Sequence, residues 1–123
     1  MQIAPNIHLK ELSCRCGCAT PSERLPALVT LGFCLQRIRD HFNAPIYINS
    51  GYRCTAHNTS VGGAARSFHV SGMAADIRVK DVHPQIVYKH IMLLMQKGLI
   101  LSGGIKCYPS FVHYDIRGTV TKF

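Results

Sequence analysis

Two histidines and one aspartate stand out in the sequence as candidate ligands for a metal ion. His69 lies in a polar segment, Asp76 follows on an expected strand, and His113 lies on a different expected strand. Two neutral imidazoles and one carboxylate form the ligand set of a catalytic zinc site, in which a fourth position stays open for water or substrate. The pattern therefore predicts a hydrolytic zinc centre. The alternative is that His69 is an exposed loop residue and that His113 forms an ordinary polar pair with Asp115.

The cysteines suggest a second metal site, although their pattern fits more than one interpretation. Cys14, Cys16 and Cys18 form a Cys-x-Cys-x-Cys cluster, and the other three cysteines are scattered along the chain. The cluster together with Cys54 would make a structural metal site; free thiols or one or two disulfides are the other interpretation. Cys34 lies among apolar positions of an expected helix, which is typical of a small core residue.

The spacing of apolar residues predicts the elements that must position these side chains. From Leu28 to Phe42 apolar residues recur every three or four positions, and Pro26 fits only the first turn of such a helix. Gly32 within this helix indicates a close contact at that point. The patterns predict helices over 25–42 and 83–97, and strands over 46–49, 73–79, 103–108 and 111–116, the last two joined as a hairpin at Pro109-Ser110.

Alternation along the expected strands places the candidate ligands on polar faces. In the strand over 73–79, Ile77 belongs to the apolar face and Asp76 points the other way. His113 shares a face with Asp115 in the last strand. The polar segment 51–71, which contains His69, is a long connection for so small a domain, and such connections are usually functional.

Length and composition favour one small globular domain. The chain has 123 residues, of which 47% are apolar and 16% charged, a balance that is typical of a compact fold. No apolar run is long enough to span a bilayer. We expect a single domain over residues 1–123, opened by an N-terminal arm (residues 1–20) that contains the cysteine cluster. The order of elements predicts an α+β fold with helices packed on a mainly antiparallel sheet.

Several segments resemble one known protein family. Ser67 to Asp76 is similar to the Ser-x-His-x-x-Gly-x-Ala-x-Asp signature of the M15 peptidases, zinc-dependent D-Ala-D-Ala carboxypeptidases and related cell-wall endopeptidases. The resemblance covers essentially the whole chain in the correct order. The segments that resemble the phage-associated branch of the family are Glu11 to Cys18, Ile48 to Asn58, Val61 to Ala64, Gly103 to Ile105 and Tyr108 to Gly118.

This resemblance implies a ligand set and a fold. It implies that His69, Asp76 and His113 bind one catalytic zinc ion, and that the chain has the fold shared by this family and the hedgehog signalling domain, with two principal helices. Arg53 matches an arginine that lies beside the active site in such enzymes and stabilises substrate or transition-state oxygens. The alternative for Arg53 is a cation that holds the long polar segment in place.

One position departs from the family pattern. Several branches place an acid, the general base, three residues before the last histidine ligand, and this chain has Ser110 there. Of the six acids, Glu11, Glu23 and Asp40 belong to the arm or the first helix, Asp76 is the expected ligand, and Asp81 is expected to cap the second helix. Only Asp115 is left. We therefore predict that Asp115 is the base; the alternative is a carboxylate that orients an imidazole or pairs with Arg117. His57 is a second candidate for proton transfer or substrate binding.

The predicted function is hydrolysis of peptide bonds in peptidoglycan stem peptides, by a D-Ala-D-Ala carboxypeptidase or an endolysin-type endopeptidase. The alternative is a non-catalytic, zinc-stabilised module of a phage structure or one that binds cell walls. The formal charge of +8 favours anionic partners. We expect no nucleic acid among them, because the sequence has no basic helix and no aromatic stacking platform. We also expect no membrane partner and a monomer. Met1 to Asn6 lack a signal-peptide pattern, which predicts synthesis in a host cytoplasm and action on the wall after release.

Overall fold

The computed structural model describes residues 1–123 and combines short N-terminal elements with a mixed arrangement of helices and strands. Along the chain these are β1 (Gln2–Ala4), β2 (Ile7–His8), the 3-10 helices η1 (Leu9–Leu12) and η2 (Ser22–Arg24), α1 (Leu25–Phe42), β3 (Ile46–Ser50), α2 (Thr55–Ser60), β4 (Ala74–Val79), α3 (Pro84–Gln96), β5 (Gly104–Cys107), β6 (Val112–Asp115) and β7 (Thr121–Lys122).

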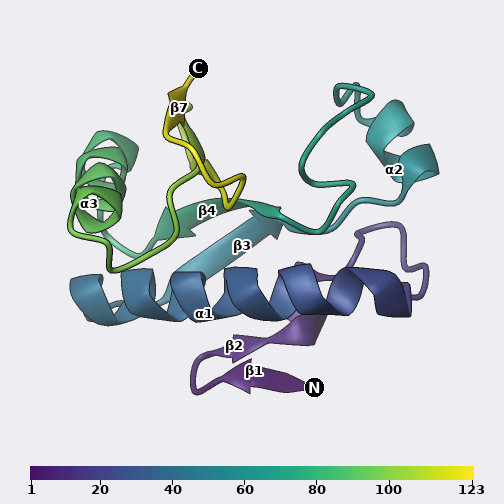
Figure 1. The fold of residues 1–123 in the computed structure, drawn as a ribbon, viewed down its shortest axis with the longest axis horizontal. Coiled ribbons are helices and arrows are strands. Elements are labelled where there is room, and N and C mark those ends of the chain that lie inside the picture. Colours follow the sequence, from purple (N-terminus) through teal and green to yellow (C-terminus); the bar gives the residue numbers. More distant parts are fainter.

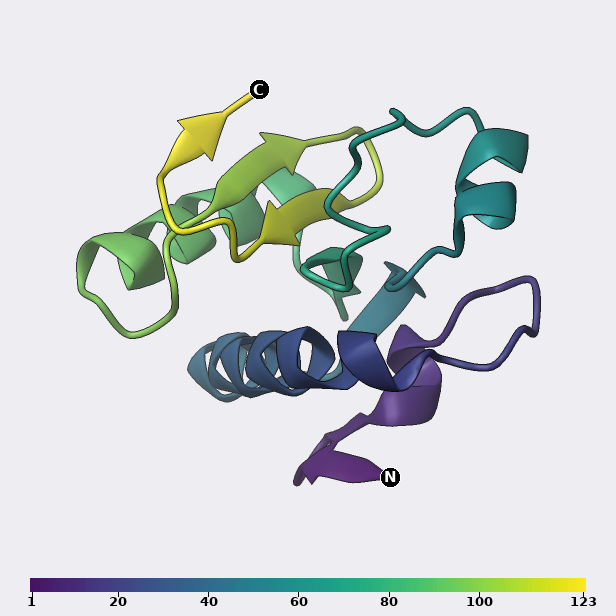
Figure 2. The same cartoon turned by 45° about the vertical axis from the view of Figure 1, so that its right-hand side comes forward.

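A five-stranded sheet in the order β3-β4-β6-β5-β7 forms the main scaffold. Every neighbouring pair is antiparallel except β5 and β7, which run parallel. Strands β1 and β2 form a separate antiparallel pair. α3 and α2 lie at opposite ends of the molecule, with the sheet between them (Figures 1 and 2). The predicted α+β class, with a mainly antiparallel sheet and two principal helices, is confirmed.

Helix α1 has the predicted bounds and lies between the β1–β2 pair and the larger sheet (Figure 1). Asn43, in the left-handed region at φ 48°, ends it. The close contact predicted at Gly32 is made by Ile3 of β1, because a Cβ atom at Gly32 would lie 2.6 Å from Ile3 Cγ2. The fully buried residues of its apolar stripe are Leu28, Leu31, Leu35 and Ile38.

The two faces of β4 differ as the alternation predicts. Ala75, Ile77 and Val79 belong to the hydrophobic core, which also receives apolar side chains from α1 and α3. Asp76 points to the opposite face, where it is 7% exposed. The helices thus cover one side of β4 and leave the other side for polar groups.

Three local features differ from the sequence-based expectations. The polar segment 51–71 is not a continuous loop, because it contains the short helix α2. The side chain of His83 caps α3 by accepting a hydrogen bond from the Gln85 amide, so the expected cap by Asp81 is wrong; Asp81 instead occupies the left-handed region at φ 61°. Strand β7 was not predicted. No helix is long and apolar enough to cross a membrane.

Packing of α3 on the sheet gives a matched test of the core. Leu94 is 3% exposed and Leu93 is 37% exposed, so neighbouring residues of one helix sample the core and the surface. We expect Leu94→Ala to lower the free energy of unfolding by about 2–5 kcal/mol, because it removes buried methyl groups and leaves a cavity. Leu93→Ala should change it by less than about 1 kcal/mol. Urea unfolding followed by circular dichroism measures both, and equal effects would contradict the described packing.

Candidate metal centre

Asp76 and His113 face each other across two neighbouring strands. Asp76 of β4 pairs directly with His113 of β6 in the antiparallel register. Their side chains project to the same side of the sheet, and His113 Nδ1 lies 3.1 Å from Asp76 Oδ1. Both residues are buried. The strand register alone therefore places one imidazole beside one carboxylate.

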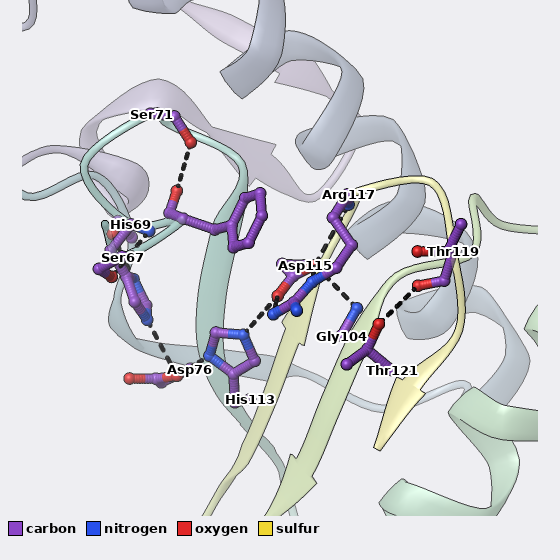
Figure 3. Close-up of polar contacts among 12 residues, drawn as sticks. Ser67, His69, Ser71, Asp76, Gly104, His113, Asp115, Arg117, Thr119 and Thr121 are labelled. Carbon is purple, nitrogen blue, oxygen red and sulfur yellow. Dashed lines mark hydrogen bonds and ion pairs between the residues drawn. The ribbon is translucent and has the colours of Figure 1, made fainter. Parts of the chain in front are cut away.

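His69 reaches the same carboxylate oxygen from the turn that precedes β4. Gly72 takes a left-handed conformation at φ +78°, which reverses the chain between His69 and the strand. Within this turn the His69 amide donates to Ser67 Oγ at 3.1 Å. His69 Nε2 then lies 3.2 Å from Asp76 Oδ1 (Figure 3), and the residue is only 3% exposed.

The outer nitrogen of each imidazole also has a partner that sets the tautomer. His69 Nδ1 lies 2.7 Å from the carbonyl oxygen of Gly51, and a carbonyl can only accept, so Nδ1 donates. His113 Nε2 lies 2.8 Å from Asp115 Oδ2, to which it likewise donates. When the rings are neutral, the unprotonated nitrogens are therefore the two that point at Asp76, where a metal ion would bind. The hydrogen bonds of the metal-free centre to Asp76 Oδ1 require a proton on those nitrogens.

These three side chains fit the coordination preferences of zinc. His69 Nε2, Asp76 Oδ1 and His113 Nδ1 all lie within 4.8 Å of one another. Zinc binds such ligands at about 2.0–2.1 Å, and tetrahedral geometry then separates neighbouring ligand atoms by about 3.3 Å. The contacts of 3.1 and 3.2 Å to Asp76 Oδ1 are close to that spacing. The group is in position to hold a metal ion.

Asp115 lies behind His113, away from the convergence point of the ligands (Figure 3). Its carboxylate is fully buried and accepts from the Gly104 amide at 2.7 Å. Arg117 donates to both oxygens, with Nε 2.9 Å from Oδ1 and Nη2 2.7 Å from Oδ2. Both oxygens of Asp115 are thus engaged, and Asp115 is not among the residues that line the cleft.

The pKa values of the metal-free centre show how its charges interact. Burial alone would raise the pKa of Asp76, but hydrogen bonds from His113 and His69 outweigh it and lower the pKa to about 2. Burial would lower the pKa of His113, but its bonds to Asp115 and Asp76 raise it above the ordinary value. For Asp115, burial opposes ionisation, and the hydrogen bonds from Arg117 and His113 hold its pKa well below the usual range.

A cleft of about 500 Å³ opens above the three candidate ligands. Its lining contains three arginines, Arg53, Arg66 and Arg117, and one acidic side chain, that of Asp76. Arg53 Nη2 lies 3.4 Å from the outer oxygen of Asp76, Oδ2. Arg117 also stacks over the ring of Phe68 at 4.3 Å, which joins the His69 turn to the end of β6. The cleft is therefore cationic and suits an anionic ligand.

The structure brings some of the predicted site residues together and separates others. Arg53 joins the candidate ligands in the cleft, whereas His57 is not among its lining residues; it lies on α2, and its amide donates to Cys54 Sγ. Cys14, Cys16, Cys18 and Cys54 gather into a second group of their own.

Sequence-based reasoning missed two groups at this site, the side chain of Arg66 and the main-chain carbonyl of Gly51. Arg66 lines the cleft, and its place in the polar segment just before the Ser67-x-His69 motif is the signal that could have found it. The carbonyl of Gly51 orients His69, and no sequence signal marks a main-chain group for such a role.

Comparison with known proteins agrees with this arrangement. The family model for Peptidase M15 matches residues 5–115, which include all three candidate ligands, Arg53 and Asp115. No curated protein shows significant sequence similarity to the chain. The M15 peptidases are metal-dependent, and the donor set of the cleft is one that could hold a metal ion. The match covers most of the sequence, and the chain therefore belongs to the M15 peptidase family.

Proposed function

We propose that the protein is a zinc-dependent peptidase that hydrolyses peptide bonds in the stem peptides of bacterial peptidoglycan. The observation that carries this proposal is the convergence of His69 Nε2, Asp76 Oδ1 and His113 Nδ1 on one point at the base of an open, cationic cleft. Family membership supports a peptidase. The cleft gives that activity a location and a preferred charge for its substrate.

The candidate ligands fit zinc in number, atom type and spacing. When bound there, zinc supplies the Lewis acidity that activates water and polarises a peptide carbonyl. The protein's contribution is to present two unprotonated imidazole nitrogens and one carboxylate oxygen in a fixed geometry. Gly51 and Asp115 hold the imidazoles in the required tautomers.

Arg53 is placed to act on the charge that develops during peptide hydrolysis. Its guanidinium lies in the cleft beside Asp76 and is held by Ser50 Oγ at 3.1 Å and Asn58 Oδ1 at 3.3 Å. A pre-positioned cation next to the reacting carbonyl stabilises a forming oxyanion without further reorganisation. We assign this role to Arg53.

The charge of the cleft favours stem peptides over uncharged peptides. Arg66 adds a cation to the wall of the cleft, and stem peptides carry free carboxylates that its guanidinium can bind in a bidentate manner. Arg117 also lines the cleft, but its guanidinium is paired with Asp115. Asp76 is the one acidic side chain that lines the cleft, and its carboxylate faces the histidines. Substrate carboxylates would therefore be attracted to the cleft.

Asp115 acts in this proposal as a positioning residue for His113. Its side chain is fully buried and binds Gly104, Arg117 and His113, so it presents no oxygen to the cleft. Its carboxylate keeps the ring of His113 in one tautomer and one orientation. This differs from the general-base role that elimination among the acids favoured.

Metal removal provides the first test of the activity. We expect the purified protein to release peptides or D-Ala from isolated peptidoglycan, a chelator to abolish that release, and added zinc to restore it. His69→Ala should remove the activity, because one of three ligands is lost. Mass spectrometry of the digest identifies the bond that is cut: D-Ala alone indicates a carboxypeptidase, and new internal amino termini indicate an endopeptidase.

Ser110→Ala is the matched control for this test. It changes the position where other family branches carry an acid, but Ser110 does not line the cleft, so activity should stay near the parent level. If zinc-loaded protein cleaved no wall type, the peptidase proposal would fail in favour of a non-catalytic wall-binding module.

Asp115→Asn distinguishes a positioning residue from a general base. Loss of the carboxylate that orients His113 should weaken zinc binding by about 10–100-fold, so that excess zinc restores much of the lost activity. Loss of a base would instead lower kcat at every zinc concentration, by about 100-fold or more, with zinc binding unchanged. Zinc titration of activity, with zinc affinity measured by competition with a chelator, separates the two outcomes.

Asp81→Asn serves as the control for the acid-to-amide change. Asp81 is exposed and in the left-handed region, a conformation that asparagine tolerates well. Its zinc affinity and kcat should match those of the parent protein. Circular dichroism of Asp115→Asn checks that the buried substitution leaves the fold intact.

A further inference from the structure

We propose that Cys14, Cys16, Cys18 and Cys54 form a second zinc site, of structural type, that anchors the N-terminal arm to the segment carrying Arg53. This site is built from four thiols and shares no residue with the His69, Asp76 and His113 group. It does not depend on the proposed peptidase activity.

The four sulfur atoms converge although they come from two distant parts of the chain. Cys14 Sγ lies 3.3 Å from Cys16 Sγ and 3.8 Å from Cys54 Sγ, and the Cys16 and Cys54 sulfurs are 3.6 Å apart. All four sulfurs, that of Cys18 included, lie within 4.8 Å of one another. Zinc–sulfur bonds of about 2.3 Å in a tetrahedron separate neighbouring sulfurs by about 3.8 Å. The thiols thus surround a position suited to a zinc ion.

The arrangement favours a metal over disulfides. A disulfide joins thiols in pairs, whereas Cys14, Cys16 and Cys54 form a triangle with nearly equal sides. No two cysteines are joined by a disulfide in the structure. Four thiolates in a roughly tetrahedral group are the ligand set of structural zinc sites, and Cys16 and Cys18 are exposed, which gives an ion access.

Main-chain donors support negative charge on two of the four sulfurs, those of Cys14 and Cys54. The Cys54 amide donates to Cys14 Sγ at 3.4 Å, and the His57 amide donates to Cys54 Sγ at 3.4 Å. Hydrogen bonds of this kind orient ligands and stabilise the anionic form that a metal requires. Cys16 lies in a turn that runs from Cys14 to Gly17. The Gly17 amide donates to the Cys14 carbonyl at 3.1 Å, and Gly17 takes a left-handed conformation at φ +86°.

The polypeptide around the cluster has little else to hold it. Residues 15–19 are exposed and lie outside any helix or strand. The loop that contains them runs beside α2 (Figures 1 and 2). So short and exposed a segment buries too little apolar surface to order itself, and small structures of this kind are commonly stabilised by a metal. A zinc ion would supply the missing constraint.

The site would also fix the backbone next to Arg53. The amides of residues 52 and 54 bind the arm, at the Leu12 carbonyl (2.8 Å) and at Cys14 Sγ. The amide of Arg53, between them, points to the opposite side and donates to the His69 carbonyl at 3.0 Å. Clamping Cys54 to the arm therefore restrains Arg53.

Metal analysis of three variants tests the second site. We expect His69→Ala/His113→Ala, which lacks the first group of ligands, to retain one zinc per chain after desalting. Adding Cys16→Ser/Cys18→Ser should abolish that zinc, and both serines replace exposed residues that the core does not need. Adding Cys107→Ser instead, which changes a cysteine outside the cluster, should leave it in place. Cobalt substitution should give a thiolate-to-cobalt charge-transfer band that only the Cys16→Ser/Cys18→Ser change removes.

Two further measurements keep the proposal falsifiable if the quadruple variant fails to fold. In the otherwise unchanged protein, Cys16→Ser/Cys18→Ser should lower the zinc content by one ion per chain and lower Tm. Intact mass under native redox conditions counts the thiols, because each disulfide removes two hydrogen atoms. Zinc content unaffected by Cys16→Ser/Cys18→Ser, disulfides located among the four cysteines by peptide mapping, or reduced thiols without zinc would each overturn the proposal.

Discussion

Both histidines of the candidate centre are aimed at one atom, Asp76 Oδ1, and the position of that atom depends on the sheet. β4 lies between β3 and β6, and the register aligns Ser50, Asp76 and His113 in one row across the three strands. Ser50 Oγ accepts from Arg53, whose guanidinium also contacts Asp76. The rest of the cleft is built around this row. A one-residue shift in the register of β4 would turn Asp76 into the core and dismantle it.

Concentrating so many charged and polar groups in a buried site requires that each has a partner. No buried side-chain nitrogen or oxygen lacks a hydrogen bond. Burying an ion costs several kcal/mol unless partners compensate. Arg117 meets this need for Asp115 through two parallel bonds, and the histidines meet it for Asp76. A side chain removed from this network leaves another group buried without its partner, so its members cannot be varied independently.

Local periodicity was enough to predict the parts of the fold that bury apolar surface. The bounds of α1 and the two faces of β4 follow from the spacing of residues such as Leu35 and Ile77. α2 was not predicted, because its residues Thr55–Ser60 are polar and carry no apolar stripe. β7 is only two residues long, and its existence depends on pairing with β5. Short elements of this kind are determined by the surrounding tertiary structure.

The candidate ligands were recognisable in the sequence, but the groups that orient them were less so. Asp115 shares a strand face with His113, and this position alone is compatible with either a general base or a carboxylate that orients the imidazole. The proposed positioning role depends on the Gly104 amide and the Arg117 guanidinium, which bind the carboxylate of Asp115. The carbonyl of Gly51 has no signature in a side chain at all. Such partners become visible only when strands and loops distant in sequence are brought together.

The extended segment 51–54 connects the two candidate metal groups. Its groups alternate in direction, as in a strand: residues 51 and 53 bind the ring and the carbonyl of His69, and residues 52 and 54 bind the arm. A Cβ atom at Gly51 would lie 2.7 Å from the carbonyl oxygen of Leu12, so the close approach of segment and arm requires glycine there. A shift of the arm would move this segment, and with it both the hydrogen-bond acceptor of His69 and the guanidinium beside Asp76. The arm thus belongs to the scaffold that positions the candidate centre, although it contributes no side chain to the cleft.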